Sequence, residues 1–303
     1  MSEQGFGEPR SEKLHGTPEE ILREVLPFVR EAYMKAQKKI AEGAIKPESF
    51  LPQHDPEDNA KYDPHDPPYD QEVVKADIEW AEEMNQQFLK TLDIDKIHAD
   101  IIEAILYEHI EQSNWFGDGV RTIKTSRYDD LKNGVDLIVE FDEGMDQFTH
   151  MGLAVDVTFG ETKLRSKIEK IKEEIAAGEL AHIRYFESER SHHKGVYQNL
   201  PRVVIGVDRS HLIELARMWV DDARKKEFAT HPVQKLILHQ VAQQLMSFSR
   251  FAEECGKYEI ANIYRKQLAL IQRRLAQKQD IDAARYEEAD GVGRSIKRQL
   301  ELF

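Results

Sequence analysis

Two aspartates stand inside runs of β-prone apolar residues. Asp136 lies between Val135 and Leu137, and Asp156 lies between Val155 and Val157. An ionised carboxylate on a buried strand costs several kcal/mol unless a cation or strong hydrogen-bond donors compensate it. A divalent metal such as Mg²⁺ compensates such charge, prefers oxygen ligands, and can activate water beside a phosphoryl group. Alternatively, each aspartate faces solvent on a half-exposed strand or pairs with a lysine.

The elements that would position these acids lie in the middle of the chain. Alternating and β-branched residues predict strands at 120–125, 135–141, 153–159, 181–186 and 203–207. Helical periodicity predicts helices at 94–112 and 161–177 within this region. The same periodicity predicts flanking helices at 18–42, at 71–92 and from 210 to about 275, with breaks near 230–232 and 255–256.

This order predicts an α/β fold with a mixed sheet and helical regions on both sides. We expect a flexible arm at 1–17, N-terminal helices at 18–93 with a Pro/Asp/His-rich linker at 46–69, and the α/β core at 94–209. A C-terminal helical region at 210–289 and a flexible tail at 290–303 follow. Residues 189–194 read as a solvated loop between the last two strands, although two adjacent histidines there could also touch phosphate.

The order helix, three strands, helix, strand resembles the core of the PD-(D/E)XK nuclease superfamily, from about residue 94 to 207. In this resemblance Glu103 or Glu108 is the helix acid, Asp136 is the acid of the second strand, and residues 156–158 are the third-strand motif. Thr158 stands where the family pattern has lysine. Some members take the lysine from the following helix instead.

The resemblance implies a metal-dependent mechanism. Asp136, Asp156 and the carbonyl of Val157 would hold one or two Mg²⁺ or Mn²⁺ ions against a scissile phosphate, with Glu103 binding directly or through water. A lysine would orient the attacking water; Lys167 is our first choice and Lys163 the second, because the two share one helix face. If neither lysine reaches the metal, the domain would be a non-cutting relative.

The chain ends in Gln299-Leu300-Glu301-Leu302-Phe303, which is similar to the peptide that docks bacterial replication and repair proteins on the DNA sliding clamp. Leu302 and Phe303 would fill an apolar pocket while Gln299 forms a hydrogen bond nearby, and Leu300 belongs to the same motif. Glu301 replaces the more usual Ser or Asp. Alternatively, the tail packs its leucines and phenylalanine on the helical region.

Composition limits the remaining possibilities. The net charge of −14 argues against diffuse binding of nucleic acid, so a polyanion site has to be a local basic patch. No apolar run reaches the roughly 18 residues of a membrane span, and the polar N-terminus lacks a secretion signal. With a lone cysteine, Cys255, we expect a cytoplasmic protein that does not enter a membrane.

Together these features predict a Mg²⁺-dependent nuclease, with DNA as the expected nucleic-acid substrate, that is tethered to a bacterial sliding clamp. One alternative is a catalytically inactive adaptor that keeps the fold and binds DNA or the clamp without cutting, which Thr158 favours. Another is a structural protein whose strand acids are ordinary surface residues. The sequence leaves the oligomeric state open.

Overall fold

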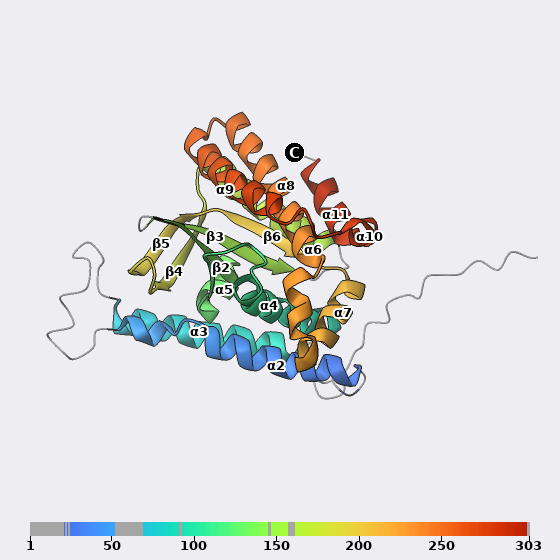
Figure 1. Ribbon diagram of the computed structural model, residues 1–303. Coiled ribbons are helices and arrows are strands. Elements are labelled where there is room, and N and C mark those ends of the chain that lie inside the picture. Colours follow the sequence, from blue (N-terminus) through green and yellow to red (C-terminus); the bar gives the residue numbers. More distant parts are fainter. Residues whose placement is uncertain are drawn as a thin grey trace, which may run out of the picture.

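The computed structural model describes residues 21, 23, 25–51, 69–90, 93–144, 147–156 and 161–301, with the side chains of 153–163 left out (Figure 1). Its strands are β1 (Val120–Lys124), β2 (Leu137–Gly144), β3 (Gln147–Asp156), β4 (Ala181–Ser188), β5 (His193–Leu200) and β6 (Arg202–Gly206). Its α-helices are α2 (Pro27–Gly43), α3 (Gln71–Lys90), α4 (Ile94–Gln112), α5 (Arg127–Asn133), α6 (Glu161–Ala177), α7 (Arg209–Val220), α8 (Val233–Glu254), α9 (Tyr258–Ala276), α10 (Ala284–Ala289) and α11 (Gly291–Leu300). Two 3₁₀ segments, η1 (Pro47–Phe50) and η3 (Asp222–Thr230), complete the described elements.

The central sheet has four strands in the order β1-β2-β3-β6. The pairs β1–β2 and β2–β3 are antiparallel, whereas β3 and β6 are parallel, so the sheet is mixed. A parallel neighbour requires a crossover, and the chain between β3 and β6 provides one that includes α6. The residues that open β2 are apolar and buried, as expected for a strand covered on both faces. The fold is therefore mixed α/β, as the sequence predicts.

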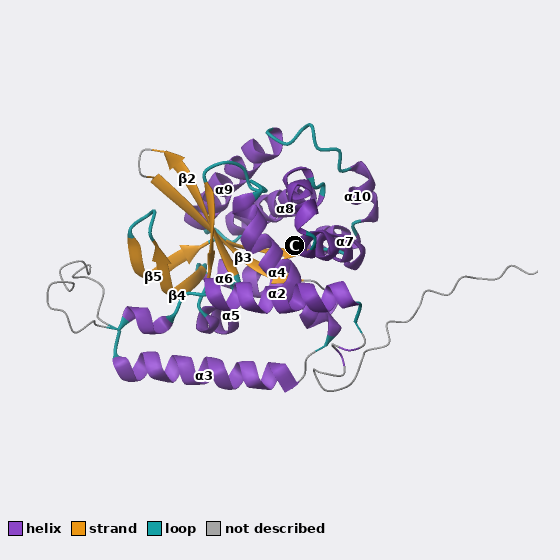
Figure 2. Cartoon of the chain, turned by 60° about the horizontal axis from the view of Figure 1, so that its bottom comes forward, coloured by secondary structure: helices purple, strands orange, loops and turns teal. Residues whose placement is uncertain are grey.

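Helices cover both faces of this sheet. Figure 1 shows α2, α3 and α4 below the strands and α8 and α9 above them, and Figure 2 shows α3 as a straight rod running in nearly the same direction as α2. One apolar cluster joins residues of α2, α4, the sheet, α7, α8, α9 and α11. None of the helices that the structure describes combines the length and the apolar character that a bilayer span requires.

Local signals explain where the helices begin and end. The carboxylate of Asp93 caps α4 by accepting the N–H of Lys96 at 2.8 Å. Gly256, with a φ of 72°, follows the end of α8 and permits the turn into α9. The helix predicted at 18–42 is broken, because α2 begins at Pro27, which has no N–H to continue a preceding helix.

Two glutamines of α8 bond the backbone of β6 on the side away from β3. Val204 N–H donates to Oε1 of Gln244 at 2.8 Å, and Nε2 of the same side chain donates to Val204 O at 2.7 Å. Gln240 repeats this arrangement with Gly206, at 3.3 and 3.0 Å. Two side chains four residues apart on the helix thus bond two residues that are two positions apart on the strand. The outward-facing N–H and C=O groups of Val204 and Gly206 therefore have hydrogen-bond partners without another strand.

A separate hairpin of β4 and β5 lies beside the sheet. The carboxylate of Asp129, at the start of α5, accepts the N–H groups of Arg184 and Tyr185 on β4 at 2.7 and 3.0 Å. The predicted loop at 189–194 is wrong at its end, because β5 already begins at His193. The prediction missed β5 because its residues are mostly polar and largely exposed, without the apolar alternation of a half-buried strand.

The expected linker at 46–69 is partly ordered into the fold. Phe50 of η1 is buried, and its ring meets Tyr69 and Tyr185 edge-on. Residues 52–68 lie outside the described part. At the other end of the chain, the flexible tail expected at 290–303 is instead a helix over most of its length. Val292, Ile296 and Leu300 of α11 are buried, and Asp290 caps this helix by accepting the N–H of Gly293 at 2.8 Å.

Candidate functional site

A cavity of about 370 Å³ opens at one end of the sheet, between α3, α4, α5, α6 and β6. Its lining is strongly cationic: Lys96, Arg127, Lys167, Lys170 and Arg202 surround two carboxylates, Asp130 and Asp136, with Phe88, Leu131, Gly134, Ile171 and Val204. Asp100 and Glu174 pair with Lys96 and Arg202, at 2.6 and 2.8 Å, yet the cations still outnumber the acids. In a protein of net charge −14, this cavity is a local basic site.

The two carboxylates of the cavity are hydrogen-bonded to each other. Burial, together with the charges of Asp130 and Glu103, raises the pKa of Asp136 well above its usual value. For Asp130 burial acts in the same direction, but Lys124 and Arg127 outweigh it and lower the pKa. Two carboxylates in contact cannot both ionise cheaply, and the opposite directions of the two pKa shifts make Asp136 the acid that ionises less readily.

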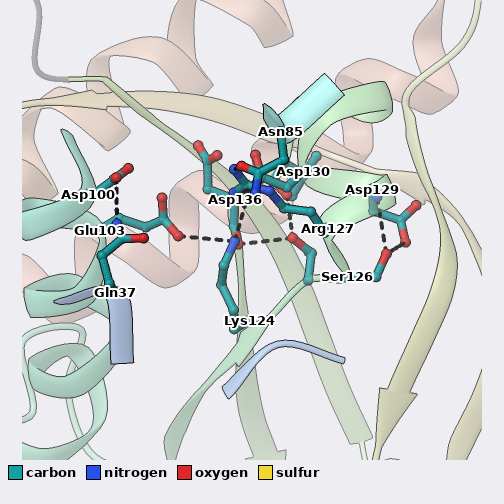
Figure 3. Close-up of polar contacts among 12 residues, drawn as sticks. Gln37, Asn85, Asp100, Glu103, Lys124, Ser126, Arg127, Asp129, Asp130 and Asp136 are labelled. Carbon is teal, nitrogen blue, oxygen red and sulfur yellow. Dashed lines mark hydrogen bonds and ion pairs between the residues drawn. The ribbon is translucent and has the colours of Figure 1, made fainter. Parts of the chain in front are cut away.

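Lys124, the last residue of β1, stands at the centre of this group (Figure 3). Its ammonium lies 3.0 Å from Oε1 of Glu103, 3.3 Å from Oδ2 of Asp130 and 2.9 Å from the carbonyl oxygen of Asp136. The side chain is only 2% exposed. Burial alone would lower the pKa of Lys124, but Asp130 and Glu103 raise it, so the lysine stays charged. Glu103 and Asp130 therefore share a built-in counter-ion.

The structure separates the two candidate helix acids. Glu103 points from α4 toward Lys124 (Figure 3). Glu108, five residues further along the helix, pairs with Lys39 of α2 at 3.0 Å and accepts the indole N–H of Trp219 at 3.3 Å. Because only Glu103 contacts the group around Lys124, it is the helix acid of this site.

The predicted site residues are brought together only in part. Asp136 and Lys167 line the same cavity, and the charge of Lys167 acts on Asp136 by lowering its pKa. The backbone of Asp156 pairs with Gly206 at the end of β3, at the same end of the sheet as Asp136, because β2 and β3 are antiparallel. The side chains of Asp156 and Lys163, and all of Val157 and Thr158, lie outside the described residues.

A metal ion fits this site only if residues beyond those described take part. Within the described part of the chain, no group of three His, Cys, Asp or Glu side chains is arranged to hold an ion. The described residues do supply one pair of hydrogen-bonded carboxylates, Asp130 and Asp136. Such a pair is a good ligand for a divalent cation, which would displace the proton.

Sequence reasoning missed Lys124 and Asp130. In the structure Val120, Thr122 and Lys124 alternate along β1 and are all buried, whereas Arg121 and Ile123 are less so. The sequence places an apolar residue on each face of this strand, so it does not mark the lysine. Asp130 follows a helix N-cap, Ser126, whose hydroxyl accepts the N–H of Asp129 at 3.1 Å. An acid in the first turn of a helix is common, because it interacts favourably with the helix N-terminus, so no local pattern marks Asp130 as a site residue.

A second buried acid lies further along β2. Glu140 accepts the hydroxyl of Ser188 at 2.5 Å and contacts Nε2 of His150 at 2.8 Å. Burial would raise the pKa of Glu140, but hydrogen bonds from His150 and Ser188 outweigh it and lower the pKa. Tyr197 contacts the other nitrogen of His150 at 3.1 Å. These residues tie the sheet to the hairpin, and Glu140 does not line the cationic cavity.

Comparisons with protein-family models, with curated proteins and with solved structures find no match for this chain. Its function therefore has to be argued from the site alone.

Proposed function

We propose that this protein is a metal-dependent nuclease that hydrolyses phosphodiester bonds of nucleic acid, with DNA as the expected substrate, in the cationic cavity. The observation that carries the proposal is the meeting of Asp130 and Asp136 with Lys167 and four further cations in one cavity of an acidic protein. Carboxylates of this kind hold metal, and the cations bind phosphate. The central sheet and its helices follow the order α4, β1, β2, β3, α6, β6, with α5 inserted between β1 and β2 and the β4–β5 hairpin inserted between α6 and β6. This order, with Glu103 on α4 and Lys167 on α6, supports the resemblance to the PD-(D/E)XK superfamily.

Each residue has a role in this proposal. Asp136 and Asp130, with Asp156, would hold Mg²⁺ or Mn²⁺, which offsets charge on the phosphate and activates a water. Lys167 and Lys170 would receive the phosphate from the α6 side, and Arg127 and Lys96 from the α5 and α4 side. Lys124 and Glu103 lie behind the acids and would position them.

Cleavage of a fluorescently labelled DNA strand with and without Mg²⁺ or Mn²⁺ tests the proposal. Removing an ionisable ligand should lower the rate by about 10²-fold or more, so Asp136→Asn should nearly abolish cleavage. Asp142→Asn is the matched control, because Asp142 is an exposed aspartate on β2 outside the cavity. Cleavage that needs no metal, or that survives Asp136→Asn, would refute the proposal.

The alternative is a non-cutting protein that binds nucleic acid in the same cavity. The ammonium of Lys124 favours it, because Glu103 and Asp130 already have a counter-ion without metal. This alternative predicts tight, salt-sensitive binding of the oligonucleotide together with no cleavage in either metal. It also predicts that Asp136→Asn leaves binding unchanged.

Docking on a bacterial sliding clamp through Gln299, Leu300, Leu302 and Phe303 stays a second proposal. Gln299 and Leu300 form the end of α11, and Leu300 is buried there, so docking would first require the last turn of α11 to unwind. Leu302 and Phe303 lie outside the described residues. Deleting residues 299–303 should abolish binding to a purified clamp, and binding that is unchanged would contradict the proposal.

A further inference from the structure

A second cavity, of about 330 Å³, adjoins the first and lies between α2, α3, α4 and β1. Phe88, Lys96 and Arg127 line both cavities, so the two are neighbours across these three side chains. The guanidinium of Arg127 is held there by Asp130, at 3.2 Å, and by the side-chain oxygen of Asn85. A ligand with its phosphate in the first cavity would therefore have its next chemical group beside the second.

The chemistry of the second cavity differs from that of the first. Its described lining includes four neutral hydrogen-bonding side chains, Tyr33, Gln37, Asn85 and Thr125, whereas the described lining of the first cavity includes none. Its apolar surface comes from Ile40, Ala41, Ala44, Phe88 and Leu89. Lys96, Asp100, Lys124 and Arg127 complete the lining, and Lys96 pairs with Asp100 at 2.6 Å. Apolar surface with amide and hydroxyl groups beside these charges suits a planar ring with hydrogen-bonding edges.

Phe88 gives this pocket an aromatic face at the point where it meets the cationic cavity. The side chain is 46% exposed near the end of α3, and the neighbouring Leu89 is 43% exposed. Exposed aromatic side chains next to a cationic groove are the common platform for stacking unpaired bases. A base in a duplex is already paired and stacked, and it cannot enter a pocket beneath a helix without leaving the duplex.

From this juxtaposition we infer that the second cavity is a subsite for one unpaired nucleobase, next to the phosphate in the cationic cavity. The inference rests on the proposed function and narrows its substrate to single-stranded nucleic acid, such as a free end or a flap. Phe88 would stack on the base, and Lys96 and Arg127 would bind the phosphate between the cavities. Gln37 donates its Nε2 to Asp100, and Asn85 accepts Arg127 at its Oδ1, so Oε1 of Gln37 and Nδ2 of Asn85 would meet the edge of the base.

Oligonucleotide binding is measured in EDTA, which removes divalent metal and so prevents cleavage. Binding at the subsite can then be measured without hydrolysis. The probes are a fluorescein-labelled 12-nucleotide DNA strand, the same strand made wholly of abasic sugars, and the matching duplex, all at one salt concentration. The intact strand should bind about tenfold more tightly than the abasic strand, equivalent to about 1.4 kcal/mol, and more tightly than the duplex. Equal binding of the intact and abasic strands would overturn the subsite.

Variants test whether the difference in affinity between the intact and abasic strands comes from the second cavity. Phe88→Ala should weaken binding of the intact strand about tenfold and leave the abasic strand unchanged, whereas Val73→Ala, an exposed apolar residue of the same helix outside both cavities, should change neither. Lys167→Gln should weaken both strands equally, because it acts on phosphate. If Lys167→Gln changes neither strand, the proposed function fails; if Phe88→Ala leaves the intact strand unchanged, only the subsite fails.

Discussion

Asp136 and Glu140 are acids four residues apart whose pKa values shift in opposite directions. Asp136 is half-buried and directly precedes β2, whereas Glu140 is fully buried in the middle of that strand. Glu140 receives hydrogen bonds from His150 and Ser188, which lower its pKa and keep it ionised. Asp136 is crowded by Asp130 and Glu103, and burial with these charges raises its pKa. The first acid is satisfied by the protein itself, whereas the second faces a cationic cavity. A strongly perturbed acid that lies in a cavity is a candidate functional residue, and of these two acids only Asp136 meets both conditions.

Among the charged residues around Asp136, replacing Lys124 should cause the largest loss of unfolding free energy. Lys124→Met leaves Glu103 and Asp130 buried without their counter-ion, and breaking a buried ion pair in this way costs about 3–5 kcal/mol. Urea denaturation followed by tryptophan fluorescence measures the loss. Lys75→Met is the control, because its pair with Glu79 is largely exposed and should be worth less than about 1 kcal/mol. Equal losses in the two variants would show that Lys124 is not a structural counter-ion.

Glu140 should matter for stability and not for nucleic acid. Glu140→Gln replaces an acceptor oxygen with an N–H₂ group facing the donors Ser188 and His150, which should cost about 1–3 kcal/mol of unfolding free energy. Oligonucleotide binding and cleavage should be unchanged, since Glu140 does not line the cationic cavity. A loss of cleavage in a stably folded Glu140→Gln protein would erase the distinction between the two acids.

Of the three variants, Asp136→Asn should change the unfolding free energy least. It should raise that free energy, whereas Lys124→Met and Glu140→Gln lower it. An acid whose pKa is raised in the folded state loses stability as pH rises from its unfolded value of 3.8 through the folded pKa. Asparagine resembles the protonated acid, so the variant should be more stable than the wild type at pH 7. Glu140 has a lowered pKa, so its contribution is present above 4.5 and is lost as pH falls.

Thermal unfolding of the wild type and of Asp136→Asn between pH 4 and 8 measures this difference. The gap between the two proteins should widen as pH rises above about 4, because only the wild type has the aspartate to ionise. A gap that narrows with rising pH would mean that the pKa of Asp136 is lowered in the fold. In that case the pKa values of Asp136 and Glu140 would shift in the same direction.

The sequence was a better guide to the sheet than to the site. Asp93 caps α4 and the apolar runs of β2 and β6 are locally encoded, so these elements appear close to where they are predicted. Contacts between distant segments are not encoded locally. Lys124 meets Glu103 and Asp130 only after α4, β1 and α5 have packed together, and its sequence context resembles that of an exposed strand lysine.

The C-terminal segment is a second case in which contacts between distant parts of the chain decide the structure. Here they order a segment for which the sequence predicts flexibility. Glycines at 291 and 293 indicate a flexible tether, yet residues 291–300 form a helix because Val292, Ile296 and Leu300 share one face and pack against α8 and α6. Tertiary burial outweighs the roughly 1 kcal/mol that each glycine costs a helix. The spacing of the three apolar residues was the available signal, and the short length of the segment concealed it.

The hydrogen bonds of the Gln240 and Gln244 side chains to the backbone of β6 limit how copies of this protein can associate. A bare outer strand is a template for pairing with a foreign chain, and such pairing underlies domain exchange and fibre growth. Here an incoming chain would have to displace four hydrogen bonds from a buried helix before the first new bond could form at Val204 or Gly206. Two copies therefore cannot pair their sheets at the outer edge of β6 while these hydrogen bonds are in place. Copies that associate at this edge would have to do so through their helices.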